Sequence, residues 1–491
     1  MPARIGIVGG GFSGLLSAYL LERLGSGQLE IVLFEEAARI GGRVRSGRLP
    51  HGGGGYEAGV AEFYDIAGNA QLRNLIDHLG LETRPLSGTP YFSVDDQVLA
   101  DERALTRWLG RRSMERLRWF WDQGTRLRSP AQYAMAGREQ DNAHPWLRRS
   151  FEDVLSEIDD APAEWFTAMQ CHSDLATEPA HTNGLFGMDN LLIDHPGYCS
   201  MYTLTDGNEG LIRALAERVN ARVYHDTPVK AVHAHETRGL VVEVARDAVR
   251  ERFEVDALIV TLPPSGLQAI QWYDEELSGT VAGHVRHHDH GTSYLRVTLL
   301  FRQRFWRDVF PEDYFVSDAF GGVTVYDQSP DDGSAGCGVQ SWLLAGADAA
   351  EQMLRPDQEV IAAVMGAMPA AIRAPANALL HGRVDRWTGV AGVSALPGGV
   401  PLRPLTERHS PDARWPQLQF VGDYLYDSTV CGALDAVLYS VFAVADHLGV
   451  PAGNGATGFA DLVRAPASSA VARAPSGAMA PFFLDPHAVP R

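Results

Sequence analysis

The sequence predicts an α/β fold, and three observations support this prediction. The β-branched run Ile5 to Val8 leads directly into a glycine-rich turn, and an apolar helical pattern follows from Leu15 to Leu24. A second apolar run, Leu29 to Phe34, predicts a neighbouring parallel strand. Strand and helix patterns then recur to about residue 450. Together they predict a Rossmann-type domain that is interleaved with an α+β domain.

The glycine-rich turn fits the dinucleotide-binding motif G-x-G-x-x-G. Gly9 permits the tight turn, Gly11 lets a pyrophosphate approach the backbone, and Gly14 lets the helix pack closely on the strand. Phe12 and Ser13 lie in the same turn and are predicted to contact the cofactor. The following helix offers free N–H groups and a partial positive charge to the phosphates.

Glu35, at the end of the second strand, strengthens the motif. An acidic residue ~20 positions after the third glycine is placed to accept hydrogen bonds from the ribose hydroxyls. The alternative for Glu35 is an ordinary solvated acid at a strand end.

The segment that follows resembles a known protein family. Glu35-x-x-x-Arg39-x-Gly41-Gly42-Arg43 is similar to the second fingerprint of the glutathione-reductase-type FAD proteins. In particular it resembles the flavin amine oxidase superfamily, which includes monoamine and polyamine oxidases, L-amino-acid oxidases and the flavin histone demethylases. The resemblance implies bound FAD, with Gly42 and Arg43 supporting its pyrophosphate.

Two further segments extend the resemblance. Glu57 to Phe63 is similar to the family segment whose backbone passes the flavin ring, which implies a cofactor contact at Ala61. Thr227 to Val232 resembles the segment whose valine, here Val229, meets the adenine through its backbone.

The last fingerprint lies near the end of the predicted domain. Leu418 to Asp423 is predicted as a strand that ends in Gly422-Asp423, and the final helix opens near Val430 and Cys431. The resemblance implies that Asp423 binds the ribityl chain and that the helix N-terminus faces the flavin pyrimidine. A helix N-terminus there would stabilise negative charge on reduced flavin.

The domain boundaries follow from these segments. Residues 1–85, 201–285 and 405–450 are predicted to form the FAD-binding domain, and residues 86–200 and 286–404 the substrate-binding domain. Residues 451–491 are rich in Ala and Pro and are predicted to be a C-terminal tail.

Composition limits the class of partner. The formal net charge of −19 argues against nucleic acid or an anionic membrane and fits a soluble enzyme. The four cysteines are scattered, which favours free thiols in a reducing cytosol. The first strand begins within four residues of the N-terminus, and no apolar run of 18 residues occurs. We therefore expect a cytoplasmic protein without signal peptide or transmembrane helix; a homodimer is compatible with the sequence.

Several departures from the family concern the chemistry. The segment after Trp387 has no cysteine, although monoamine oxidases attach FAD through one there, so FAD is expected to be noncovalent. Trp387 is expected near the flavin, the alternative being a core tryptophan.

Glu62 and Asp65 stand where amino-acid oxidases have a carboxylate-binding arginine, which predicts that the site binds an amino group rather than an α-carboxylate of the substrate. Tyr424 and Tyr426 are candidates for the family's aromatic pair, with ordinary buried tyrosines as the alternative.

Arg296 is expected to occupy the place of a family lysine. That lysine holds a water under flavin N5 and lies in the strand before Phe305-Trp306; counting back from this pair reaches Arg296. The only lysine, Lys230, lies in the adenine-side segment. Arginine can hold a water but cannot relay a proton, because its pKa stays above ~12. The alternative is that Arg296 points to the other face of its strand and pairs with an acid.

A cluster of four histidines stands before the same strand, at His284, His287, His288 and His290. Their spacing fits no zinc pattern, so a polar loop is favoured over a metal site.

The resemblance implies an FAD-dependent oxidoreductase that transfers a hydride from the carbon next to an amine nitrogen to flavin N5, with O2 or another electron acceptor. Two alternatives stay open. One is an FAD dehydrogenase or desaturase with a carbon substrate and a different acceptor; the other is a redox-silent FAD-binding protein.

Overall fold

A five-stranded parallel sheet forms the centre of the part that contains the N-terminus. The computed structural model describes residues 2–25, 27–87, 91–137, 139–235, 239–246, 249–330, 336–388, 400–410, 412–427 and 429–450; the predicted tail, residues 451–491, lies outside them. The sheet order is β10-β2-β1-β14-β21. Its strands are β10 (Arg222–Tyr224), β2 (Leu29–Phe34), β1 (Ala3–Val8), β14 (Ala257–Val260) and β21 (Leu418–Phe420). Since these strands come from three distant stretches of the chain, the predicted interleaved α/β fold is confirmed.

Two helices pack against each other beside this sheet: α1 (Phe12–Gly25), which starts three residues before the predicted Leu15, and α15 (Val430–His447). A glycine is required at position 14, in the first turn of α1, because a Cβ there would lie 1.9 Å from the carbonyl oxygen of Gly9. Among the described residues, α15 alone is long and apolar enough to cross a membrane by length and composition. Its apolar window is 56% buried inside the protein, as in a core helix.

A smaller four-stranded sheet lies beside the parallel sheet, in the order β13-β12-β11-β15. It contains β13 (Val249–Val255), β12 (Leu240–Arg246), β11 (Val229–Ala234) and β15 (Gln271–Trp272). The chain passes from β13 to β14 within residues 253–260. The division falls at Asp256, whose carboxylate accepts the backbone N–H of Arg4 at 2.8 Å and so ties the crossing point to β1.

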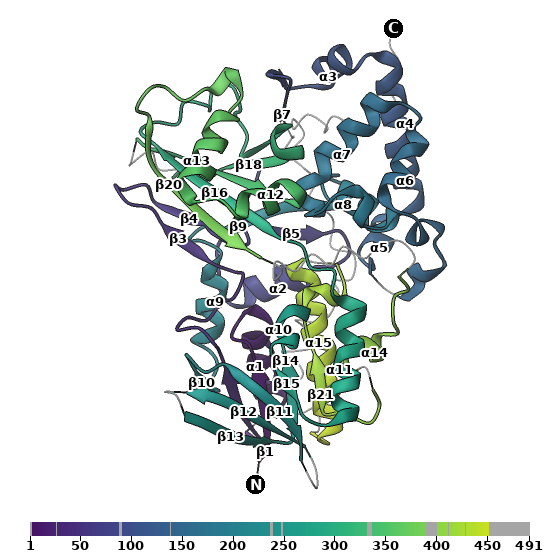
Figure 1. The fold of residues 1–491 in the computed structure, drawn as a ribbon, viewed down its shortest axis with the longest axis vertical. Helices are drawn as coiled ribbons and strands as arrows, with labels where there is room; N and C mark the ends of the chain where they lie inside the picture. The colour runs from purple at the N-terminus through teal and green to yellow at the C-terminus, as the bar shows by residue number, and fades with distance from the viewer. Residues whose placement is uncertain are drawn as a thin grey trace.

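A seven-stranded sheet and a group of helices form the other part of the molecule (Figure 1). In sheet order the strands are β20 (Leu379–Trp387), β16 (Tyr294–Phe301), β19 (Gly338–Leu344), β18 (Val323–Asp327), β17 (Tyr314–Ser317), β7 (Tyr91–Val94) and β8 (Gln97–Leu99). The helices include α3 (Glu102–Leu109), α4 (Arg111–Leu127), α5 (Pro130–Tyr133), α6 (Phe151–Leu155), α7 (Ala161–Leu175), α8 (Gly184–Leu192), α12 (Gly346–Met353) and α13 (Asp357–Gly366).

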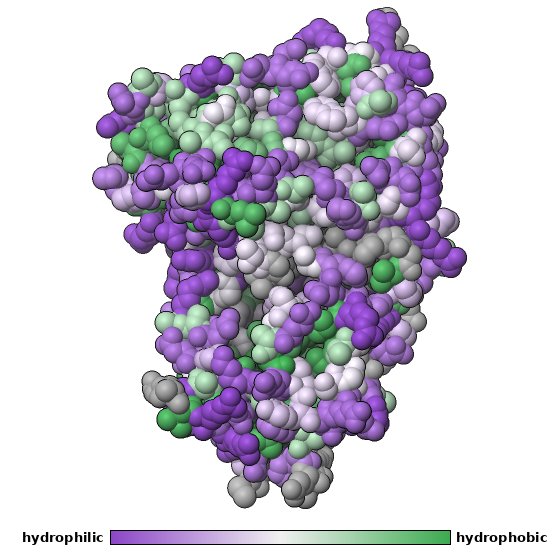
Figure 2. Space-filling model, in the orientation of Figure 1, coloured by the Kyte–Doolittle hydropathy of each residue, from purple (hydrophilic) through white to green (hydrophobic). Residues whose placement is uncertain are grey.

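The two parts are joined by short elements. A three-stranded sheet has the order β5 (Phe63–Ile66), β9 (Cys199–Leu204) and β6 (Thr83–Pro85), and β3 (Ser46–Arg48) pairs with β4 (Gly55–Glu57). The remaining helices are α2 (Gln71–His78), α9 (Glu209–Ala216), α10 (Pro264–Gln268), α11 (Glu275–His288) and α14 (Leu405–His409). Polar side chains cover most of the face in Figure 2, and hydrophobic residues appear there in small groups.

The histidine cluster is not a polar loop, so that expectation is wrong. His284 and His288 lie on the last turns of α11 and are 0% and 5% exposed. They pack on one another and on Tyr424, because i and i+4 positions share a helix face. Helix α11 also runs across residue 285, where a domain boundary is predicted; the boundaries stay a prediction.

Candidate functional site

The turn between β1 and α1 faces the loop that follows β2. Gly11 and Gly41 form an isolated parallel bridge, and Gly41 donates its N–H to Gly10 O at 2.8 Å. A Cβ on Gly11 would point toward the Gly42 backbone, 3.7 Å from its Cα, so two side-chain-free segments face each other across a narrow gap. Gly42 has φ +55°, a conformation that glycine adopts without strain. The side-chain-free backbone of both segments is compatible with a pyrophosphate beside them, which needs close access to backbone N–H groups.

Glu35 lies at the rim of this gap. Its carboxylate accepts the N–H of Gly10 at 2.7 Å and the N–H of Ala37 at 2.9 Å, which orients the acid. The backbone of Glu35 also accepts the N–H of Thr227 at 2.8 Å. Through this bond the chain brings Val229, the first residue of β11, to the same end of the sheet. The ribose and adenine roles stay predictions, and the geometry is compatible with both.

Arg43 and Asp423 join the second and third fingerprints. The guanidinium donates two hydrogen bonds to the carboxylate, at 2.7 and 2.6 Å, from positions 380 residues apart. Asp423 follows β21 and Gly422, and the N-terminus of α15 comes shortly after, where Thr429 caps the N–H groups of Cys431 and Gly432. The second and third fingerprints therefore lie in one region.

Trp387 lies at the edge of this region. Its indole N–H donates to the carbonyl oxygen of Ala58 at 2.8 Å, within the segment expected to pass the flavin ring. Ala61 is 5% exposed and packs in a small cluster with Tyr314, Tyr326 and Leu343. The end of β20 and the Glu57–Phe63 segment are thus held together.

Beyond Ala61, three carboxylates meet inside the protein. Glu62 precedes β5, Asp174 lies in the last turn of α7, and Asp194 follows α8. Glu62 raises the pKa of both Asp174 and Asp194, and Asp194 raises the pKa of Asp174, so the three carboxylates are neighbours. We call them, together with Arg296, the inner cluster. Neither Asp174 nor Asp194 carries a local sequence signal, which is why sequence reasoning missed them.

Tyrosines form the walls of the inner cluster. Tyr64 donates its hydroxyl to Glu62 Oε1 at 3.2 Å, and Tyr326 stands close enough to lower the pKa of Glu62. Tyr294 donates to the carbonyl oxygen of Ser173, beside Asp174, at 2.9 Å. Glu62 Oε2 is buried and has no hydrogen-bond partner.

Burial governs the titration of the inner cluster. Burial, followed by the charges of Asp194 and Glu62, holds the pKa of Asp174 well above its usual value. Burial and Glu62 raise the pKa of Asp194 to about 7. The pKa of Glu62 is also raised by burial, although Arg296 opposes the shift. Carboxylates whose pKa values are raised in this way lack enough positive charge around them.

Arg296 faces this cluster. In β16, Leu295, Val297 and Leu299 pack into a hydrophobic core, so Arg296 lies on the opposite face. It is 3% exposed, its Nη1 donates to Ser341 Oγ at 3.3 Å, and its guanidinium stands 5.4 Å from the centre of the Tyr326 ring. Its chemical role stays a prediction.

The other candidate residues lie elsewhere. Asp65 is bound by the Arg73 guanidinium at 2.5 Å, so its charge is already balanced. The Tyr424 hydroxyl is 3.0 Å from His284 Nε2, and the Tyr426 hydroxyl is 3.0 Å from His409 Nε2. Of the predicted substrate residues, the structure therefore places Glu62 in the inner cluster and pairs the other two with basic side chains.

Within the described residues, no group of three or more His, Cys, Asp or Glu side chains is arranged to hold a metal ion.

Comparisons with known proteins identify the family and the fold. A family model described as flavin-containing amine oxidoreductase matches residues 12–438. A solved structure of wild-type putrescine oxidase bound to putrescine is 20% identical, with a TM-score of 0.70 over 91% of this chain and 99% of that chain. Cyclohexylamine oxidase from Brevibacterium oxydans is 16% identical, with a TM-score of 0.67 over 91% of this chain and 100% of that chain. A search of curated protein sequences found no match.

Proposed function

The chain belongs to the flavin-containing amine oxidoreductase family, and from that premise we propose that it oxidises a C–N bond of an aliphatic diamine, with O2 as the electron acceptor. Its cofactor is FAD, held noncovalently. A cytoplasmic location and a homodimer stay predictions.

The charge of the inner cluster carries the proposal. The inner cluster contains three carboxylates and one guanidinium, so its net charge is −2 when all four groups are ionised. Enclosed charges are costly unless they are paired. A diamine carries two positive charges at neutral pH and would balance both, whereas a monoamine would balance one.

The arrangement also suggests which nitrogen reacts. Glu62 directly follows Ala61, in the segment expected to pass the flavin ring, and Arg296 faces it. Asp174 lies at the end of α7 and Asp194 just after α8, on the helical side of the cluster. We therefore place the reacting amine at Glu62 and the distal ammonium at Asp174 and Asp194, with tyrosine rings beside the aliphatic chain.

The reacting nitrogen must lose a proton before its neighbouring carbon can give up a hydride. Glu62 is suited to accept that proton, because burial raises its pKa and its Oε2 has no partner. The positive charge of Arg296 would also favour the neutral form of the reacting amine over its protonated form at Glu62. FAD, when bound, accepts the hydride; the residues named here bind, orient and deprotonate the amine.

The putrescine oxidase structure was solved with a diamine, and its fold extends over 91% of this chain. That likeness is compatible with the proposal, which depends on the side chains of this chain.

An anaerobic flavin-reduction screen tests the proposal. The holoenzyme is mixed with aliphatic diamines, with monoamines of equal carbon number and with L-amino acids, and flavin bleaching is followed. We expect diamines to reduce the flavin at concentrations at least tenfold lower than matched monoamines, and L-amino acids to be slowest. Equal response to diamines and monoamines would refute the distal ammonium site. Bleaching by dithionite alone would instead support the redox-silent alternative.

A further inference from the structure

A buried histidine holds the turn that carries Asp423. His284 of α11 stacks on the ring of Phe420, the last residue of β21, with 4.4 Å between the ring centres. Its Nε2 is 3.0 Å from the hydroxyl of Tyr424. His284 therefore contacts the chain on both sides of the turn between these two residues. Asp423 ends that turn, and its carboxylate accepts both hydrogen bonds from Arg43.

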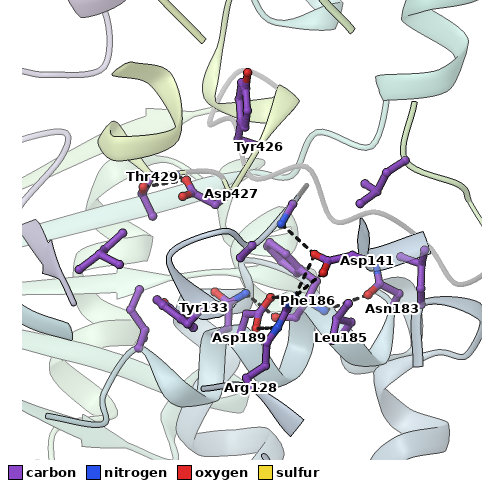
Figure 3. Close-up of a pocket in the computed structure, with 17 residues that line it drawn as sticks. Arg128, Tyr133, Asp141, Asn183, Leu185, Phe186, Asp189, Tyr426, Asp427 and Thr429 are labelled. Carbon is purple, nitrogen blue, oxygen red and sulfur yellow. Dashed lines mark hydrogen bonds and ion pairs between the residues drawn. The ribbon is translucent and has the colours of Figure 1, made fainter. Parts of the chain in front are cut away.

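A second tyrosine–histidine pair holds the same segment two residues later. The Tyr426 hydroxyl is 3.0 Å from His409 Nε2, and His409 Nδ1 is 2.9 Å from the carbonyl oxygen of Phe420. Tyr426 also lines a pocket that contains Arg128, and Figure 3 shows its hydroxyl pointing away from that arginine. The segment from Phe420 to Tyr426 is thus attached to α11 through one histidine and to α14 through another.

The histidines of α11 have ring nitrogens without partners. His284 and His288 lie on one face of the helix, and His284 Nδ1 and both ring nitrogens of His288 are buried with no hydrogen-bond partner among the described residues. The His288 ring lies 4.6 Å from that of His284 and 5.4 Å from that of Tyr424, measured between ring centres. A buried imidazole without a carboxylate partner is more stable in its neutral form, because a charge there would not be compensated.

The charged groups around this pair are basic. Burial is the main reason why the pKa of His284 and that of His288 lie well below the usual value, and neighbouring basic groups lower both further. These groups are Arg403, Arg408, His287 and His409. Two carboxylates stand next in sequence to the network, but Asp289 accepts Gln268 Nε2 at 2.9 Å and Asp423 is bound to Arg43. A proton on either histidine would therefore add positive charge where positive charge is already present.

We propose that His284 is a positioning residue for the cofactor, which holds the turn before Tyr424 so that Asp423 stays on Arg43, and that it does so while His284 and His288 are neutral. The proposal depends on FAD and not on which amine is oxidised. Below the ordinary histidine pKa of ~6.5, each proton that the closed turn excludes favours the open turn by about tenfold per pH unit. FAD should therefore leave the protein faster as the pH falls.

A double-mutant cycle at pH 8 tests the positioning role. The dissociation constant of FAD is measured by flavin fluorescence for the parent, His284→Phe, Tyr424→Phe and the double variant. Phenylalanine at position 284 keeps a ring to stack on Phe420 but makes no hydrogen bond to Tyr424. Each single variant should raise the dissociation constant at least tenfold, and the double variant should stay within threefold of the single ones. If the double variant shows the product of the two single effects, the residues act independently and the proposal is overturned.

The pH dependence of FAD release is the second test. Release from the diluted holoenzyme is followed between pH 8 and pH 5.5, and the parent should release FAD at least tenfold faster at pH 5.5. His284→Gln should remove most of this difference, because the amide can still bond the Tyr424 hydroxyl but cannot take up a proton. His225→Gln is the matched control, since His225 is exposed and lies outside the network; it should keep the pH dependence of the parent.

Two results of the pH experiment would overturn the proposal: equal release from the parent at both pH values, or full pH dependence in His284→Gln. A histidine with a merely structural role would weaken FAD binding equally at all pH values. Melting temperatures check that each variant folds, and if His284→Phe does not fold, the comparison of the parent with His284→Gln decides alone. No amine is used, so the outcome is independent of the proposed function.

Discussion

Replacing Asp194 by Asn tests the distal ammonium site most directly. The change removes one negative charge from the inner cluster while keeping the size of the side chain. A carboxylate and an ammonium ~4 Å apart attract each other by about 4 kcal/mol at an effective dielectric constant of 20, and a hydrogen bond to a charged group contributes about 1.5–3 kcal/mol. Because Asp174 remains to hold part of the charge, we take the lower range. The expected loss is a 10- to 100-fold rise in KM for a diamine.

The assay compares anaerobic flavin reduction by a diamine and by a monoamine of equal carbon number. The monoamine should change less than threefold, since it has no distal ammonium. Asp65→Asn is the matched control, because Asp65 is a carboxylate already paired with Arg73 outside the cluster. The reasoning is refuted if diamine and monoamine reduction slow by the same factor, or if Asp65→Asn has the same effect as Asp194→Asn.

Three further predictions follow from the same geometry. Glu35→Ala should purify with less than half of the parent's FAD, measured by absorbance, because it removes the predicted ribose acceptor; full FAD content would contradict that role. Arg296→Met should slow flavin reduction or reoxidation at least tenfold, roughly 1.4 kcal/mol in the barrier; if stopped-flow traces of both half-reactions stay within twofold of the parent, Arg296 has no role in the chemistry. Asp194 has a pKa of about 7 in the folded protein and a lower one when unfolded, so folding binds a proton between these values. The contribution of Asp194 to the melting temperature of the substrate-free enzyme should therefore decrease as pH rises from 5 to 8. Over the same range Asp194 becomes ionised, so the KM for diamines should fall. A KM that rises with pH over this range would contradict the prediction.

The cofactor side of the site could be predicted from sequence because its signals are local. The turn from Gly9 to Gly14, the strand that ends at Glu35 and the Gly42-Arg43 pair lie within the first 43 residues. Each depends on backbone conformation and on spacing along one βαβ unit.

Where the sequence was ambiguous, tertiary packing made the difference. The histidines at 284 and 288 are polar in sequence, and their burial depends on the distant Tyr424, which packs on both. Residues 253–260 are divided between β13 and β14, and at the junction Asp256 exchanges two hydrogen bonds with the backbone of the distant Arg4. Neither partner lies within reach of a local pattern.

The sequence by itself determined the α/β class, the FAD-binding region and the family, because glycines, β-branched runs and a few charged residues report local backbone geometry. Only the tertiary structure decided which charged residues share the substrate region. Glu62 and Arg296 were candidates through the resemblance to the family, whereas Asp174, at a helix end, and Asp194, in a loop, carry no local sequence signal. They meet because β5, α7, α8 and β16 enclose one space. Charges enclosed in this way interact strongly, since little water remains to screen them.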